Sequence, residues 1–256
     1  SLNRFLSEKN GIELRHQSAG SALGFSREVY AGLAELGTIG ALFPEDAGGF
    51  GGTGFDVSVV FECLGRNLAV EPLLGALVVG QALIAAGTDA QRAALESIMA
   101  GTSVAALAHE EPGSHYELSH VTLSATPAAD PSAGDWVLNG RKAVVPMGDA
   151  ADLLLVSART AGQPLDADGI SLFLVQGDAP DVSQRGNGRI DGGGNQHGVE
   201  EVGDRGMHEV QLAHRGRGDH DVAAAALRWL ATVEPREHTS AVPALQGPKV
   251  EPLYWA

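Results

Sequence analysis

The stretch Val104-Ala-Ala-Leu-Ala-His-Glu-Glu-Pro-Gly-Ser-His-Tyr116 marks the point where the sequence changes its pattern. It begins with a short apolar run, which is typical of a buried strand, and then turns at a Pro-Gly pair into polar residues. Apolar residues recur at helical spacing before it and gather into short strand-like runs after it. Helices followed by strands predict a segregated α+β fold.

The part before this stretch is expected to be an all-α N-terminal domain, residues 1–102. Residues 26–37 predict a helix that Ser26 caps and Gly37 ends, with apolar residues on one face. Three more apolar helices are expected at 54–67, at 73–86 and at 89–99, the last capped by Thr88 or Asp89 and ended by Gly101.

The glycine-rich segment Gly48-Gly-Phe-Gly-Gly52 lies between two of these helices. It could suggest a phosphate-binding loop, but it lacks the Lys-Ser/Thr ending of such a loop and follows a helix instead of a strand. A structural turn is the better interpretation.

The part after the stretch is expected to be a middle β domain, residues 103–193. Within residues 135–145 the pair Asn139-Gly140 stands between two strand-like runs, which predicts a β-hairpin because both turn residues need φ > 0. An antiparallel β-barrel or sandwich is the predicted architecture. Further strand-like runs lie at 104–108, 121–125, 153–157 and 170–175.

The periodic signals fail beyond Val182, apart from good helix propensity at 221–233. Prolines at 235, 243, 248 and 252 forbid a long helix after that. Residues 194–256 are therefore expected to form an atypical tail.

Composition excludes several classes of function. The 256 residues include 17 basic and 32 acidic ones, for a formal charge of −15, which disfavours nucleic acid and anionic lipid as partners. The single cysteine, Cys63, excludes a disulfide framework and any multi-cysteine metal site within the chain. No apolar run reaches about 18 residues, and the first residues lack a signal-peptide pattern, so the expectation is a cytoplasmic protein with no membrane contact.

The segment His109-Glu110-Glu111-Pro112-Gly113-Ser114-His115-Tyr116 holds the densest group of reactive side chains. The residue types allow an acid/base cluster at His109, or a metal site that adds His115. The spacing matches no known template, because a zinc-protease helix would need His-Glu-x-x-His and Pro112 interrupts the segment. A polar turn with solvated carboxylates is the preferred interpretation.

Four motifs, taken in order, resemble those of the acyl-CoA dehydrogenase family. The segment from Leu36 to Gly52 looks like the family's "ELG…PEEYGG.G" signature, and Leu64-Gly-Arg66 with the Ala100-Gly101 helix ending stand where expected. Ala106–Ser114 looks like the family's "A.TEPGAGSD" strand and loop, and Val137–Val145 looks like its "LNGxKxWIT" strand. The stretches around Leu107–Leu118 and Gly140–Asp152 are most similar to the small subunit of pimeloyl-CoA dehydrogenase.

The resemblance implies an N-terminal helical domain, a middle β-barrel and a C-terminal four-helix domain. It implies FAD as the cofactor, an acyl-CoA substrate of fatty acid metabolism, and an electron-transfer flavoprotein as the electron acceptor. A Glu of the C-terminal domain would remove the α-proton, while the β-hydrogen leaves as hydride to the flavin and gives a trans-2-enoyl-CoA. Members work as homo- or hetero-oligomers, and a non-catalytic partner subunit of a heteromeric enzyme is the alternative function.

The resemblance also assigns site residues. Leu107, His109 and Glu110 are expected along the flavin ring, with Glu110 in place of a Thr that donates to it. Val144 and Pro146 stand where Trp and Thr usually cover and hydrogen-bond the ring; a proline supplies neither an N–H nor a hydroxyl. Tyr116 is expected beside flavin phosphate or acyl-CoA, and Ser114 beside acyl-CoA.

The tail departs from the family. Ile190-Asp-Gly-Gly193 still looks like the family's "T.DGG", but the sequence after it does not, and no residue can be assigned as the catalytic base. Its richness in Gly, Arg, Ala, Pro and His fits a shifted reading frame of a GC-rich gene. Genuine divergence and an unreliable sequence assignment are the alternatives.

Overall fold

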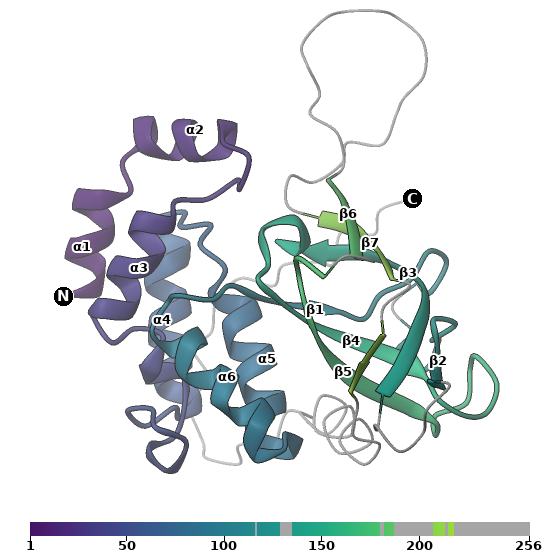
Figure 1. The fold of residues 1–256 in the computed structure, drawn as a ribbon. Helices are drawn as coiled ribbons and strands as arrows, with labels where there is room; N and C mark the ends of the chain where they lie inside the picture. Colours follow the sequence, from purple (N-terminus) through teal and green to yellow (C-terminus); the bar gives the residue numbers. More distant parts are fainter. Residues whose placement is uncertain (116, 129–134, 180–181, 187–206, 213–214, 218–256) are drawn as a thin grey trace, which may run out of the picture.

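The computed structural model describes residues 1–115, 117–128, 135–179, 182–186, 207–212 and 215–217. Six helices lie on one side of a sheet in this part of the chain (Figure 1). The helices are α1 (Leu2–Lys9), α2 (Ile12–Gly20), α3 (Arg27–Glu35), α4 (Gly54–Arg66), α5 (Leu73–Ala86) and α6 (Asp89–Met99). The strands are β1 (Ala105–Ala108), β2 (Ser124–Pro127), β3 (Asp135–Pro146), β4 (Leu153–Arg159), β5 (Ile170–Gln176), β6 (Val182–Gly186), β7 (Met207–Leu212) and β8 (Arg215–Arg217).

Local sequence signals account for the starts of three helices. The Ser26 hydroxyl accepts a hydrogen bond from the Val29 N–H at 3.2 Å and caps α3. Thr88 and Gln91 cap α6 reciprocally, in a capping box. A second capping box begins α4. All four predicted helices are confirmed, including α5, which has no side-chain cap. The helices α1 and α2 are additional to them.

The glycine-rich segment is a structural turn, as predicted. Gly48 has φ 84°, in the left-handed region. A side chain at Gly49 or Gly52 would overlap the main chain of Phe43. The glycines therefore let this turn fold tightly against the segment that precedes it.

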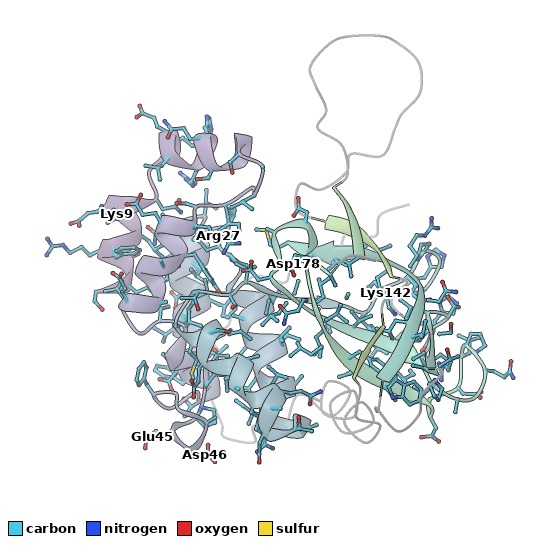
Figure 2. All side chains as sticks on the ribbon, viewed as in Figure 1. Lys9, Arg27, Glu45, Asp46, Lys142 and Asp178 are labelled. Carbon is cyan, nitrogen blue, oxygen red and sulfur yellow. The ribbon has the colours of Figure 1, made fainter. Side chains whose placement is uncertain are left out.

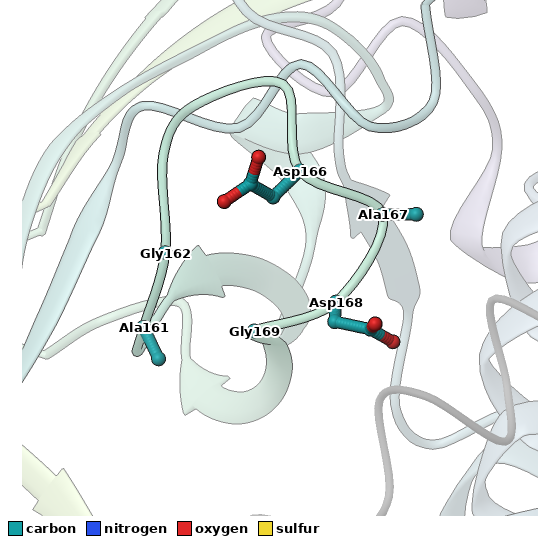
Figure 3. A pocket seen from close by; sticks show the side chains of 6 residues that line it. All are labelled: Ala161, Gly162, Asp166, Ala167, Asp168 and Gly169. Atoms are coloured by element: carbon teal, nitrogen blue, oxygen red, sulfur yellow. The ribbon is translucent and has the colours of Figure 1, made fainter.

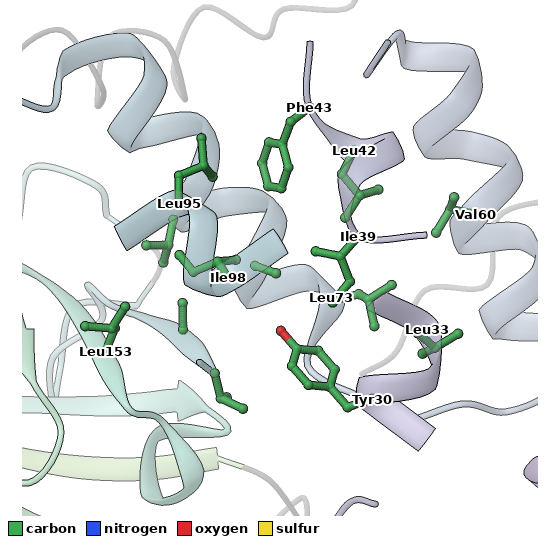
Figure 4. Packing of buried hydrophobic residues seen from close by; sticks show 14 of the residues in the cluster. Tyr30, Leu33, Ile39, Leu42, Phe43, Val60, Leu73, Leu95, Ile98 and Leu153 are labelled. Carbon is green, nitrogen blue, oxygen red and sulfur yellow. The ribbon is translucent and has the colours of Figure 1, made fainter. Parts of the chain in front are cut away.

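The helices and the sheet share one hydrophobic core. Residues from α3, α5 and α6 pack together around Tyr30, Leu73 and Ile98, and Leu153 of β4 joins the same cluster (Figure 4). At the contact of α5 with β1, a side chain at Gly75 would overlap the Ala105 carbonyl, so glycine permits a close approach. A second cluster, within the β part, includes Trp136, Leu138, Leu154 and Phe173.

The sheet is mixed, so the prediction of an antiparallel barrel is wrong for this part of the chain. β4 pairs in parallel with β1 over Ala105↔Leu153 to Ala108↔Val156, and antiparallel with β5. The cause is the path between the two strands: a turn at Gly148–Ala150 returns the chain to the beginning of β1, where the Leu153 N–H donates to the Val104 carbonyl at 3.0 Å. The two strands therefore run in the same direction, and the pairings described do not close into a barrel.

The hairpin predicted at Asn139-Gly140 is also wrong. β3 runs unbroken through both residues. Its first half pairs with β2 up to Asn139↔Ser124, and its second half pairs with β7 from Gly140↔Leu212. Gly140 has φ 152° and lies close to Leu123, so it marks the position where β3 passes from one partner strand to the next.

The strands β6, β7 and β8 were not expected from the sequence. β7 pairs with β3 on one side and with β6 on the other. The predicted helix at 221–233 lies outside the described residues. In the part of the chain that is described, no helix combines the length and apolar character needed to cross a bilayer.

Candidate functional site

The ends of β1 and β3 lie side by side. The Ala143 N–H donates to the Glu110 carbonyl at 2.8 Å, and the Lys142 ammonium donates to the His109 carbonyl at 3.0 Å. These contacts join two segments that are 33 residues apart in the sequence. We call residues 107–114 together with residues 142–146 the β1–β3 site, because this region contains every described residue that the sequence assigned to the flavin or the substrate.

A β-bulge shapes the β3 side of the site. The register of β3 against β7 shifts between Lys142 and Val145. Val144, inside the bulge, has φ 54°, which is a rare conformation for a β-branched residue, and its side chain is 45% exposed. Pro146 follows and is also exposed. Val144 and Pro146 thus present apolar side chains to the outside, while Val145 between them is buried.

A turn closed by Ser114 forms the β1 side. The Ser114 hydroxyl donates to the Glu110 carboxylate at 2.5 Å and accepts from the Glu111 N–H at 3.3 Å. The Ser114 N–H in turn donates to the Glu111 carbonyl at 3.0 Å. Ser114 is buried, so its described role is to hold the turn and to engage one oxygen of Glu110.

A buried ion pair lies directly beneath this turn. The Lys142 side chain is fully buried and donates to the Glu111 carboxylate at 2.7 Å and to the Ser157 hydroxyl at 2.9 Å, in addition to the His109 carbonyl. In Figure 2, Lys142 lies among the strands. All three donors of the ammonium are therefore occupied.

The Glu111 carboxylate is equally well satisfied. It accepts from the Leu123 N–H at 3.0 Å, from the Thr122 N–H at 2.8 Å and from the Thr122 hydroxyl. Together with Lys142 this makes four donors on two oxygens. A buried pair of charges is tolerated when hydrogen bonds replace the lost water in this way.

The electrostatics of the pair follow from burial and charge. Burial lowers the pKa of Lys142 to about 8, against the attraction of Glu111, which acts to raise it. Burial acts to raise the pKa of Glu111, but Lys142 and the hydrogen bonds from Thr122 and Leu123 outweigh it and lower that pKa below its ordinary value. Glu111 is thus an ionised acceptor at neutral pH.

The His109 side chain turns inward to the same network. Its Nδ1 lies 2.9 Å from the Ser157 hydroxyl, and the residue is 8% exposed. Since Ser157 already accepts from Lys142, its own proton is free to donate to Nδ1, which suits a neutral ring with its proton on Nε2. Burial and the Lys142 charge both lower the pKa of His109, in agreement with a neutral ring.

The structure brings most of the predicted residues to the β1–β3 site, but it buries some of their side chains and exposes others. Leu107 is half-buried, and Val144 and Pro146 are exposed, whereas the side chains of His109 and Ser114 face the interior. Tyr116 lies outside the described residues. Among the described residues, no group of three or more potential metal ligands comes together, so the metal site considered for His109 and His115 is not found there.

Sequence reasoning missed Lys142 and Ser157 as part of this site. Lys142 belongs to a motif that was recognised, but its burial was not foreseen. A signal was present, because Lys142 stands in a strand next to apolar residues, where a lysine must either reach the surface or find a buried partner.

A surface hollow lies elsewhere, in the loop between β4 and β5. Its lining is Ala161, Gly162, Asp166, Ala167, Asp168 and Gly169 (Figure 3). The buried Arg159 guanidinium anchors this loop by donating to the carbonyls of Pro164, Asp166 and Asp168 at 2.7–3.0 Å. None of the residues assigned to the flavin lines the hollow.

The fold defines the class of protein as a two-part unit, in which a helical layer is followed by a mixed sheet. The candidate site lies at the ends of two neighbouring strands of this sheet. Comparison with known proteins specifies it further. Residues 4–102 match the sequence model of the acyl-CoA dehydrogenase N-terminal domain, and residues 106–198 match that of the acyl-CoA dehydrogenase middle domain. The chain belongs to the acyl-CoA dehydrogenase family.

Individual relatives agree with this. The (2S)-methylsuccinyl-CoA dehydrogenase of Cereibacter sphaeroides is 28% identical over 193 residues, which are 74% of this chain and 34% of that protein. The solved structure of the Tcur3481-Tcur3483 steroid ACAD G363A variant has a TM-score of 0.72 at 28% identity, covering 90% of this chain and 57% of that one. The FAD complex of PigA shares the fold, with a TM-score of 0.68 at 20% identity over 89% of this chain and 58% of that one.

The chain therefore spans about a third of the length of this curated relative and somewhat over half of the matched structures.

Proposed function

We propose that this chain is a subunit of an FAD-dependent acyl-CoA dehydrogenase, which oxidises an acyl-CoA thioester to the trans-2-enoyl-CoA. The observation that carries the proposal is the β1–β3 site. Two motifs that resemble the family's flavin-facing segments meet there, joined by the hydrogen bond from the Ala143 N–H to the Glu110 carbonyl. The family membership supports the same reaction.

The residues at the site fit the flat ring of FAD by apolar contact. Val144 and Pro146 are exposed apolar side chains at the bulge, and Leu107 is half-buried on the neighbouring strand β1. We expect these three to pack against the isoalloxazine and exclude water from it. FAD, when bound, supplies the hydride acceptor, and this chain's part is to hold and orient the ring.

The same residues offer few side-chain hydrogen-bond donors. One Glu110 oxygen is engaged by Ser114, and the oxygens of a carboxylate are acceptors of hydrogen bonds. Pro146 has neither an N–H nor a hydroxyl. Hydrogen bonds to the ring would have to come from main-chain N–H groups or from another chain.

This shortage of donors favours a second candidate function: a partner subunit that completes a heteromeric dehydrogenase without turnover of its own. One solved structure of similar fold is the ChsE4-ChsE5 complex from Mycobacterium tuberculosis, which agrees with a heteromeric assembly. An acyl-CoA substrate, a homo- or hetero-oligomer, an electron-transfer flavoprotein as acceptor and a cytoplasmic location remain predictions of the proposal. So does the division into residues 1–102, 103–193 and 194–256.

An absorption experiment separates the two candidates. The purified chain is mixed with FAD, separated from free FAD by gel filtration, and scanned across the flavin bands. A yellow protein whose bands bleach when acyl-CoA is added without oxygen supports the catalytic subunit. A colourless protein that gains flavin and activity only with a second chain supports the partner subunit. A protein that stays colourless with every acyl-CoA dehydrogenase partner tested would contradict both.

A pair of variants tests the role of the bulge. Pro146→Thr restores one N–H and one hydroxyl at the position where the family has a Thr. If this residue faces the flavin, one added hydrogen bond of about 1 kcal/mol should tighten FAD binding about five-fold. The matched control is Leu165→Thr, at a residue 64% exposed in the loop between β4 and β5, which should leave the affinity unchanged. Equal effects of the two variants would contradict the assignment.

A further inference from the structure

Lys142 connects more segments than any stabilising role on one strand would need. Its three hydrogen bonds reach the His109 carbonyl and the Glu111 carboxylate after β1, and the Ser157 hydroxyl on β4. Through Glu111 the contacts extend to Thr122 and Leu123, immediately before β2. One buried ammonium thus ties β3 to the chain on three sides.

These contacts alternate with the main-chain contact at the bulge. The Lys142 side chain engages residues 109 and 111, and the Ala143 N–H engages the Glu110 carbonyl between them. Three consecutive residues after β1 are therefore attached to two consecutive residues of β3. This arrangement fixes the separation of the two segments at the position of Glu110.

The bulge needs such an attachment. A valine with positive φ is energetically unfavourable, and such a conformation persists only where the surrounding contacts impose it. Val144 is itself 45% exposed, so its own side chain has little packing to hold it. The contacts of Lys142 and Ala143 are the described interactions next to it that tie β3 to residues 109–111.

We propose that Lys142 is a positioning residue, which holds the end of β1 against the bulge of β3 and thereby sets the geometry of the surface that faces FAD. The positioning of the bulge stands on the contacts described here, and only its consequence for FAD rests on the proposed function. Lys142 is buried and does not touch the cofactor surface itself, so it acts through Glu111, the His109 carbonyl and Ala143.

The test compares Lys142→Met with Arg159→Met. Both remove a buried cation, but the hydrogen bonds of Arg159 go to carbonyls of Ser119, Val121 and the loop at 164–168. Arg159 therefore acts on the β1–β3 site only through its charge, at Glu111 and Lys142. The first measurement is hydrogen exchange of the Ala143 amide in the protein without FAD. The second is the dissociation constant of FAD from flavin fluorescence, measured with the partner chain present if the wild-type chain needs it.

Lys142→Met should speed exchange of the Ala143 amide at least tenfold relative to amides of the β4–β5 ladder, and weaken FAD binding at least tenfold. Arg159→Met should speed exchange in the loop between β4 and β5 and change neither measurement at the site. If Lys142→Met speeds all amides equally, or leaves Ala143 unchanged, the positioning role is refuted and the ion pair only stabilises the fold.

The two measurements, exchange of the Ala143 amide and binding of FAD, test the positioning role and the proposed function separately. If the wild-type protein binds no FAD under any condition, the proposed function fails, while the exchange of Ala143 still decides the positioning role. If Lys142→Met does not fold, Glu111→Gln replaces it, since it removes the partner charge but keeps a side chain of the same shape. It should speed exchange of Ala143 in the same selective way, and a uniform effect would overturn the proposal.

Discussion

The buried pair of Lys142 and Glu111 should be strongly coupled in stability. Lys142→Met leaves a carboxylate that is 4% exposed without its counter-charge. Breaking a buried ion pair by removing one partner costs about 3–5 kcal/mol, because the remaining charge is left uncompensated. Glu111 keeps its donors at Thr122 and Leu123, so we expect a cost near the lower end, about 3 kcal/mol. Glu111→Gln leaves the ammonium with neutral acceptors only and no counter-charge, at a similar cost.

The double variant Lys142→Met/Glu111→Gln removes both charges together. Its cost should fall short of the sum of the two single costs by about 2 kcal/mol, within the range found for residues in direct contact. The assay is urea unfolding followed by circular dichroism, with the free energy of unfolding extrapolated to zero urea for all four proteins. Single variants that each cost under about 1 kcal/mol, or costs that add to within about 0.5 kcal/mol, would refute the reasoning that this pair is buried and mutually compensating.

Three further outcomes follow from the structure. The folded-state pKa of Glu111 is lowered from 4.5, so the contribution of its charge to stability is complete above about pH 4.5 and is lost as pH falls through the folded pKa. The difference in unfolding free energy between wild type and Glu111→Gln should therefore shrink as pH falls below about 4.5. Urea titrations at several pH values measure this difference. Gly140→Ala should destabilise the protein by about 1–3 kcal/mol, because Gly140 has φ 152° and a Cβ there would lie 2.7 Å from a main-chain carbon of Leu123. A melting temperature unchanged within 1 °C, roughly the measurement error, would contradict this prediction. Asp152→Ala should cost about 1–3 kcal/mol, because the Asp152 carboxylate accepts from a part-buried main-chain N–H at 2.8 Å as well as from Arg27. Arg27→Ala should cost under about 1 kcal/mol, because the ion pair between the two side chains is half-exposed. Equal costs of the two variants in urea unfolding would contradict this difference in roles.

The helical part was predictable because its signals are local. Ser26 and Thr88 are cap residues that accept from N–H groups three residues later, and apolar faces of α3 to α6 recur within each helix. Each of these patterns depends only on residues within a few positions of one another. The family motifs, read in order, likewise identified the family without any knowledge of long-range contacts.

The sheet was predictable in its segments but not in its pairing. The parallel pairing of β1 with β4 joins residues 48 positions apart, and nothing near either strand encodes it. The Asn139-Gly140 pair is a local turn signal that the tertiary structure overrides, because β3 continues from β2 to β7 across it. From the sequence alone, a glycine that lets a strand change partners cannot be distinguished from a glycine in a hairpin turn.

The sequence predicted which residues form the candidate site, but it did not predict the buried hydrogen-bond network of Lys142, Glu111 and Ser157 beneath them. Resemblance to the family assigned Leu107, Glu110, Val144 and Pro146 to the flavin, and these residues lie on or just after β1 and on β3. It could not foresee that Lys142 is buried, because its partner Glu111 lies 31 residues away and only the folded sheet brings them together. It also could not foresee that the His109 ring faces Ser157 in the interior.

The central claim is that the β1–β3 site faces FAD. The most direct measurement is hydrogen exchange of peptides covering residues 107–111 and 142–147, with and without saturating FAD, in the chain alone or in the complex that binds the flavin. We predict that FAD slows exchange in both peptides and leaves the loop at residues 161–169 unchanged. Bound FAD that leaves both peptides unaffected, or that slows exchange chiefly at 161–169, would contradict the account.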